Sequence, residues 1–559
     1  MDRREFLTGG SVKKQPAMER QRIVYRTSTG LSPYTGSWTK KQVTHLLKRT
    51  MFGASLADIT YFSTKSMNDA VEELLQPTAP LPLPPVKEYD VSGATTPDND
   101  VPAGGTWIAS VNNDGTIQSR RRASLKKWWM GCMLNQDRSI REKMTLFWHN
   151  HFATEAADVS NANFLYKHVN LLRTKALGNF KQLVRDITLD PAMLIYLNGR
   201  LNTATAPDEN YARELQELFT LGKENNPNYN EDDVKAAARV LTGWRVDSNV
   251  STFPSYFTSS RHDSKNKLFS SFYNNTVITG RTGTTAGDLE LDDLLNMIFS
   301  KQLEVSRFLA KKIYRFFVYY EIDAAAEINV IEPMAVLIRS NNWELLPALR
   351  ALFKSEHFYD VLNEGCMIKA PLDHAVGLCR EWGVVFPDAV TAYTDAYGMW
   401  NYIVSAAALY QQNIGDPPSV AGWPAYYQVP QFYELWINTD TLPKRNQFSD
   451  VMIGNGYSRN GKKIVIDAVE FTKRLSNPGD PNQLINELFE QVFQIEITQQ
   501  SKDQLKKDFL LTGQEQDYYW TNAWNAYIAS PITTNFNIVN TRLRGLYKYG
   551  MNLAEYQLM

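Results

Sequence analysis

The sequence predicts a mainly α protein: one large multi-helix domain with a small β-hairpin excursion around residues 250–280. Apolar residues recur three and four positions apart through most of the chain, which is the spacing of one face of an α-helix. Residues typical of helix starts and stops lie at the two ends of these periodic segments. The stretch 245–284 lacks this period. Phe253, Phe257 and the run 276–278 are typical of extended chain there, which predicts the hairpin.

The first helices follow a polar N-terminal tail at 1–38. Thr39 is predicted to cap the first helix, and Gly53 is a natural helix stop. Ser55 then opens a second helix in a capping box, with Asp58 in place of the usual Glu. A third short helix is expected at 66–75.

Residues 77–116 are rich in Pro, Gly, Asp, Asn and Thr, which predicts a long surface loop or a partly disordered insertion. Helical periodicity resumes near Arg120, and Ser139 is predicted to cap the helix that ends near residue 152. Asn230 is predicted to cap another helix, because three acidic residues follow it and complement the helix dipole. The further predicted helices are 164–177, 179–188, 209–222, 288–319, 324–339, 343–354, 369–382, 391–409, 432–445, 464–511 and 518–543.

The predicted organisation is a main helical domain at 39–445, with 77–116 as its insertion, and a C-terminal helical region at 446–559. Residues 455–463 are typical of a linker or loop. No internal repeat period is present.

Composition excludes several classes of protein. Hydrophobic residues make up 43% and charged residues 21%, as in globular proteins. The net charge is −1 and Lys and Arg are spread along the chain, so no nucleic-acid partner is expected. No run of about 18 apolar residues exists, so no membrane span is expected. The three cysteines lack zinc-site spacing and are read as small hydrophobic residues of a reducing compartment.

The N-terminus bears on localisation. Arg3 and Arg4, with Phe6 and Leu7, resemble the start of a twin-arginine export signal. Such a signal needs an apolar stretch of about 7–15 residues next, and charges stand there instead. The predicted location is therefore cytoplasmic, with a periplasmic or exported protein as the alternative.

Two histidine motifs predict a metal site. His149 and His151 point to different sides of a continuous helix, but they can share a point if the helix ends near Asn150. Neutral imidazoles suit a divalent transition metal. His262 and Asp263 lie in the non-helical stretch, and we expect them to complete the ligand set. The alternative is that these are packing and capping side chains.

A third motif places Arg213, Glu214 and Glu217 on one helix face. Two carboxylates on one turn can act as acid and base if their surroundings separate their pKa values, so these three are the predicted catalytic residues. The alternative is an Arg213–Glu217 ion pair within a structural network.

A fourth motif, DPPSVAGWP at 416–424, predicts a rigid turn that carries Trp423. With Tyr426 nearby, this tryptophan could form the wall of a substrate pocket for a sugar ring. The alternative is a loop that packs its tryptophan on the helices.

Several ordered blocks of the chain together form a recognisable pattern. The blocks are HLLKRTMFG (45–53), MTLFWHNHF (144–152), LGNFKQLVRDITLDPAMLIYLNG (177–199), ENYARELQELFTLG (209–222), EDDVKAAARVLTGW (231–244), HDSKNK (262–267) and DPPSVAGWP (416–424). With these blocks the chain resembles the DUF1800 family, large bacterial proteins of unassigned function. The resemblance brings no activity. It implies that many members are encoded near a protein of phosphatase- or sulfatase-like fold, which is the expected partner.

The functional hypothesis is a metal-dependent hydrolase acting on a polymeric or carbohydrate-like substrate. The alternative is a non-catalytic helical scaffold that binds a partner protein, and a third hypothesis is a carbohydrate-binding module that uses Trp423. No GxSxG elbow, P-loop, GxGxxG or HExxH motif is present, so the sequence does not decide whether the protein is an enzyme.

Overall fold

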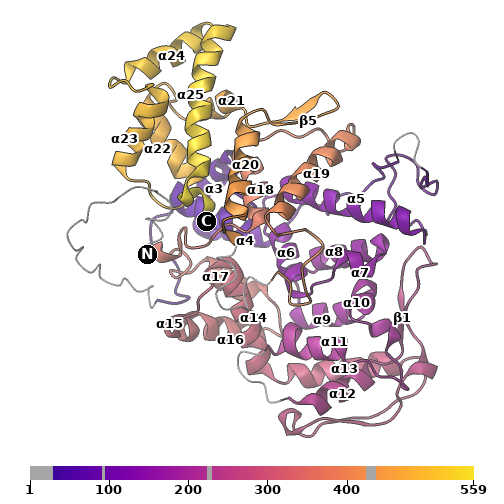
Figure 1. The fold of residues 1–559 in the computed structure, drawn as a ribbon. Helices are drawn as coiled ribbons and strands as arrows, with labels where there is room; N and C mark the ends of the chain where they lie inside the picture. The colour runs from indigo at the N-terminus through magenta and orange to yellow at the C-terminus, as the bar shows by residue number, and fades with distance from the viewer. Residues whose placement is uncertain (1–28, 91–94, 223–228, 424–435) are drawn as a thin grey trace.

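The computed structural model describes residues 29–90, 95–222, 229–423 and 436–559, and its fold is mainly α, as predicted (Figure 1). The helices of the first half are α2 (Lys40–Thr50), α3 (Leu56–Ser63), α4 (Met67–Leu75), α5 (Gly115–Leu134), α6 (Arg141–His151), α7 (Ala156–Val159), α8 (Ala162–Thr174), α9 (Phe180–Thr188), α10 (Pro191–Tyr196), α11 (Asn210–Glu214), α12 (Glu231–Val240) and α13 (Ala286–Phe299). Those of the second half are α14 (Gln302–Phe317), α15 (Ala324–Ala326), α16 (Glu332–Ser340), α17 (Leu346–Phe353), α18 (Pro371–Glu381), α19 (Tyr393–Leu409), α20 (Thr441–Ile453), α21 (Ala468–Thr472), α22 (Pro481–Val492), α23 (Gln499–Leu505), α24 (Tyr518–Ala529) and α25 (Thr533–Asn552).

The strands form small two-stranded antiparallel sheets. β1 (Trp244–Val246) pairs with β2 (Ser255–Phe257), and β3 (Lys267–Leu268) pairs with β4 (Val277–Ile278). The expected hairpin is therefore two short strand pairs. A third pair, β5 (Tyr457–Arg459) with β6 (Lys462–Ile464), lies where a linker or loop was predicted, and that prediction is wrong. Asn460 and Gly461 make the turn with φ of 50° and 75°, the left-handed geometry that Asn-Gly hairpin turns adopt.

The predicted helix caps are largely confirmed. The Thr39 side chain and the Gln42 side chain form a reciprocal capping box on α2, and Asn230 with Asp233 does the same on α12. Ser55 accepts a hydrogen bond from the Asp58 amide at the start of α3. Ser139 lies one residue outside its predicted place, because Ile140 is the N-cap of α6.

The insertion at 77–116 has no helix or strand in its described part before α5 begins at Gly115, but it is not a simple surface loop. Trp107 and Asp98 are fully buried. Asp98 accepts two hydrogen bonds from the Arg121 guanidinium of α5, at 2.9 and 3.0 Å. The insertion differs from the predicted surface loop because the buried Asp98–Arg121 pair fastens it to α5. The insertion is therefore a packed part of the molecule.

Two apolar cores lie on either side of α6. One is built chiefly from α2–α4, α9, α11–α14, α16 and α17, and the other from α5, α8 and α18–α25. Met144, Phe147 and Trp148 of α6 belong to the first core, and Leu146 belongs to the second. Figure 1 shows α6 near the centre of the molecule, with α20–α25 gathered at one end.

The predicted division of the chain at residue 445 stays a prediction, and that residue lies inside α20. The predicted helix 432–445 falls partly on 424–435, outside the described residues. Within the described ranges, no helix combines the length and apolarity needed to cross a membrane.

Candidate functional site

Helix α6 runs unbroken through His151. The Phe152 amide closes it by donating to the Trp148 carbonyl at 2.7 Å. The break near Asn150 that a shared His149–His151 site requires is therefore not formed. The two imidazoles enter different surroundings, because side chains two residues apart on a helix point to different sides.

His149 lies in an aromatic pocket of the interior. Its ring centroid is 5.0 Å from that of Trp129 and 5.6 Å from that of Trp423. The imidazole is 2% exposed, and neither ring nitrogen has a hydrogen-bond partner among the described residues. Burial holds the pKa of His149 well below its usual value, so the ring is neutral.

His151 faces the other core. Its Nε2 lies 3.0 Å from the Phe219 carbonyl oxygen, and phenylalanines such as Phe152 and Phe180 pack around the ring. Its pKa is lowered by burial as well. His151 thus ties α6 to the helical segment that ends at Thr220.

His262 and Asp263 belong to a third, separate network. The His262 Nδ1 lies 2.9 Å from the Thr242 carbonyl oxygen, and its Nε2 lies 3.1 Å from Glu290 Oε1 of α13. Lys267 pairs with the other oxygen of Glu290. Asp263 accepts a hydrogen bond from Arg239 Nε at 2.7 Å. This network fastens the strand-bearing segment to α12 and α13.

The four predicted metal ligands thus fall in three separate places, with His262 and Asp263 together. His149, His151 and His262 each lie among different neighbours. In the part of the chain that the structure describes, no three His, Cys, Asp or Glu side chains are placed to hold one ion.

The predicted catalytic residues lie on a helix of mixed type. After α11 the chain passes into a π-helix at Leu215–Thr220, a form found often at functional sites. Arg213 forms a bidentate pair with Glu231 of α12, at 2.7 and 2.6 Å. Glu214 and Glu217 are half-buried on the same helix. Their role as acid and base stays a prediction.

The loop before residue 424 docks on the end of α6. The Trp423 amide donates to Asn150 Oδ1 at 2.7 Å, and Trp423 is 3% exposed. Gly422 has a φ of 86°, and a Cβ there would lie 2.3 Å from the Asn150 carbonyl oxygen. Trp423 therefore packs against His149 inside the protein, as in the loop-packing alternative. Tyr426 lies outside the described residues.

Sequence reasoning missed a groove between the insertion, α5 and α19. Its volume is about 600 Å³. Its lining includes Leu81, Leu83, Trp128, Gln136, Arg141, Val390, Tyr393, Tyr397 and Trp400. α5 and α19 pack along each other, and Gly131 makes this possible because a Cβ there would meet the Trp400 ring at 2.6 Å.

Hydrogen bonds fix the insertion as one wall of this groove. Trp128 Nε1 donates to the Leu83 carbonyl at 2.7 Å, and the Val86 amide donates to Tyr397 Oη at 3.1 Å. Arg141 of α6 closes one end by donating to the Ala79 carbonyl at 2.8 Å. The wall is therefore preformed.

The groove combines exposed aliphatic groups with unpaired polar atoms. Leu83 is 75% exposed and Val390 70%. Both amide atoms of Gln136, and Nε1 of Trp400, have no hydrogen-bond partner within the described ranges. The Pro-rich composition of the insertion was visible in the sequence, but no spacing rule places it against residues 389–400.

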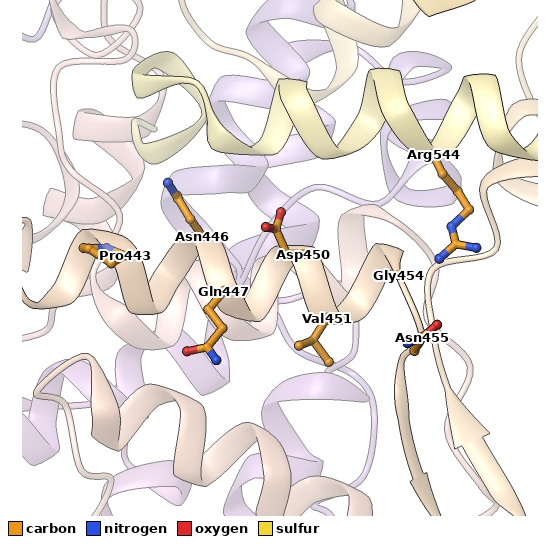
Figure 2. A pocket seen from close by; sticks show the side chains of 8 residues that line it. All are labelled: Pro443, Asn446, Gln447, Asp450, Val451, Gly454, Asn455 and Arg544. Carbon is orange, nitrogen blue, oxygen red and sulfur yellow. The ribbon is translucent and has the colours of Figure 1, made fainter. Parts of the chain in front are cut away.

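A second hollow, of about 490 Å³, lies between α20 and α25 and is drawn in Figure 2. Two of its polar side chains, Asp450 and Arg544, bind groups on the opposite helix. Asp450 pairs with Lys548 at 3.0 Å and accepts from Asn552 Nδ2 at 3.0 Å, and Arg544 Nε donates to the Ile453 carbonyl at 2.9 Å. These contacts fasten α25 to α20.

Comparison with known proteins gives a family. A family model described as "Protein of unknown function (DUF1800)" matches residues 45–557. Searches of curated proteins and of solved structures gave no match.

Proposed function

This chain belongs to the DUF1800 family, whose function is unknown, and on that premise we propose that it is a non-catalytic helical scaffold whose groove holds an extended segment of a partner polypeptide. The observation that carries the proposal is the groove itself, with its aromatic floor, exposed aliphatic rim and unpaired polar atoms. It favours the scaffold alternative over the hydrolase.

The rim supports a partner with apolar side chains. Leu81, Leu83 and Val390 are exposed aliphatic residues that line one groove. Such exposed apolar surface beside a concave pocket is typical of interaction sites. Covering one of these side chains with a partner gains roughly 1.5–3 kcal/mol.

The unpaired polar atoms support a polypeptide as the occupant. The Gln136 side chain carries a donor and an acceptor side by side, which matches the C=O and N–H of a peptide group. Trp400 Nε1 offers a second donor. A buried polar atom without a partner costs about 1–3 kcal/mol, so a bound backbone that displaced the side chains covering these atoms and satisfied them would be stabilised.

The metal-dependent hydrolase stays a prediction. It requires His149, His151, His262 and Asp263 to reach one ion. The structure holds His149, His151 and the His262–Asp263 pair in three separate surroundings. The cytoplasmic location is likewise a proposal. It agrees with the cysteines, which are free among the described residues.

The proposal is tested with an arrayed library of short peptides. We expect the protein to select peptides that share an aliphatic or aromatic residue, and Leu83→Asp or Val390→Asp to weaken the selected peptide at least tenfold, because each places a charge in the apolar contact. Affinity is measured by titration calorimetry. The phosphatase- or sulfatase-like protein that the resemblance implies is tested in the same way, as the expected source of the segment.

The matched control is Ile528→Asp. Ile528 is also an exposed aliphatic residue, at 55%, but it lies on α24, outside the groove lining. The proposal is wrong if peptide affinity falls equally in Ile528→Asp, or if no selected peptide loses affinity in the two rim variants.

A further inference from the structure

His168 of α8 stands beside His149, and their ring centroids are 6.2 Å apart. The His168 ring is fully buried, like that of His149. These two histidines come from different helices and share no sequence motif. They bring two imidazoles together at the point where α8 crosses α6.

Asp190 fixes the chemical form of His168. Its carboxylate oxygen lies 3.0 Å from His168 Nδ1, and the same oxygen accepts the Ala192 and Met193 amides at the start of α10. An ionised carboxylate only accepts, so Nδ1 carries a proton, and in the neutral imidazole Nε2 then holds the lone pair. Metal-ligating histidines usually donate a hydrogen bond from the ring nitrogen that does not bind the metal, often to a carboxylate, which fixes the orientation of the ring.

The lone pairs of this cluster are unused. Nε2 of His168 and both ring nitrogens of His149 are buried and have no hydrogen-bond partner in the described chain. Buried polar atoms in native proteins are nearly always satisfied, so three orphaned nitrogens on adjacent rings indicate a missing ligand.

We propose that His149 and His168 bind a single Cu(I) ion between them, with Asp190 as the positioning residue of His168. A ligating nitrogen lies about 2 Å from the metal, and the nitrogen lies roughly 1 Å from the centre of its ring. Two rings that share an ion therefore have centres up to about 6 Å apart. The 6.2 Å separation lies at this limit, so a shared ion would have to be coordinated nearly linearly.

The surroundings select the ion. Zinc sites need about four ligands in a tetrahedron, and within the described residues no third His, Cys, Asp or Glu completes such a set. Imidazole suits copper, and the monovalent ion needs less charge compensation in an apolar site than a divalent one. Trp129 and Trp423 flank His149, with ring centroids 5.0 and 5.6 Å from that of the imidazole, so the site has aromatic surroundings.

The test is anaerobic titration of the full-length protein with Cu(I) in competition with a chromophoric Cu(I) chelator. We expect one Cu(I) per chain, weaker binding of Zn(II), and at least a tenfold loss of Cu(I) affinity in His149→Gln and in His168→Gln. Asp190→Asn is expected to lose about 10–100-fold, the usual cost of removing such a support. Circular dichroism checks that each variant is folded.

The matched control is His374→Gln. His374 is 1% exposed and also has two unpartnered ring nitrogens, but tyrosine and phenylalanine rings surround it. Its replacement should leave Cu(I) binding unchanged. If the other variants fail to fold, X-ray absorption of the Cu(I)-loaded wild-type protein decides the matter, and two nitrogen neighbours are expected. Absence of Cu(I) binding, tighter Zn(II) binding, unchanged affinity in folded His149 and His168 variants, or sulfur neighbours would overturn the proposal.

Discussion

Glu290→Gln is expected to lower the free energy of unfolding by about 3–5 kcal/mol, measured by urea denaturation. Glu290 and Lys267 are both fully buried, and the carboxylate also faces His262 at 3.1 Å. Glutamine keeps the size of the side chain but removes its charge. The Lys267 ammonium then stays in the interior without a counter-charge, and that is the costly state.

The control for this prediction removes both charges. Lys267→Met with Glu290→Leu should recover most of the lost stability, because an apolar pair needs no compensation. Glu231→Gln serves as a second control, since its pair with Arg213 is solvent-exposed and should contribute little. If Glu290→Gln alone were as stable as the wild type, the Lys267–Glu290 pair would not hold the strand-bearing segment in place.

The Glu290 carboxylate also makes the free energy of unfolding depend on pH, and the direction of this dependence follows from its pKa. Burial raises the pKa of Glu290, but hydrogen bonds from His262 and Lys267 outweigh it and hold the pKa below its usual value. The stabilisation is therefore fully present above pH ~4.3, the usual pKa of an unfolded glutamate, and is lost as the pH falls through the folded pKa. Glu290→Gln should lack this acid-side loss.

Asp98→Asn is the second large effect, with an expected loss of about 3–5 kcal/mol in the free energy of unfolding. Asp98 and Arg121 are both fully buried, and their pair joins the insertion to α5. Tyr89 also donates to Asp98, at 2.8 Å. Because the insertion forms one wall of the groove, the variant should also weaken the selected peptide.

Asp100→Asn is the control within the same insertion. Asp100 is exposed and accepts a hydrogen bond from Asn112. It should leave both stability and peptide affinity unchanged. If Asp98→Asn lost stability without losing peptide affinity, the insertion would not be a wall of the binding site.

Local sequence signals predicted the helices well, because caps act over a few residues. Thr39, Ser55 and Asn230 cap the helices that they were expected to cap. The hairpin at β5–β6 carried a local signal too, the Asn460-Gly461 pair between strands, which was read as a linker.

The candidate sites depended on contacts between distant residues, and these the sequence could not supply. The metal hypothesis assumed that α6 breaks near Asn150, but α6 includes both His149 and His151, and Asn150 accepts a hydrogen bond from the Trp423 amide. The pairing of His168 with Asp190 and His149 depends on how α8, α10 and α6 cross. No spacing along the chain encodes that crossing.

The groove shows the same limit. One wall of the groove is the insertion 77–116, whose composition predicts a loose surface loop. The Asp98–Arg121 ion pair and the hydrogen bond from Trp128 to the Leu83 carbonyl hold it against α5. The buried Asp98 carboxylate thus holds the insertion in place as a wall of the groove.

The most direct test of the binding-protein account is site-specific photo-crosslinking. A photoreactive benzophenone amino acid replaces Leu83 in the groove or Ile528 on α24, the selected peptide is added, and cross-linked fragments are identified by mass spectrometry. The account predicts a peptide adduct from position 83 and none from position 528. An adduct from position 528, or none from position 83 with a peptide that binds, would contradict it.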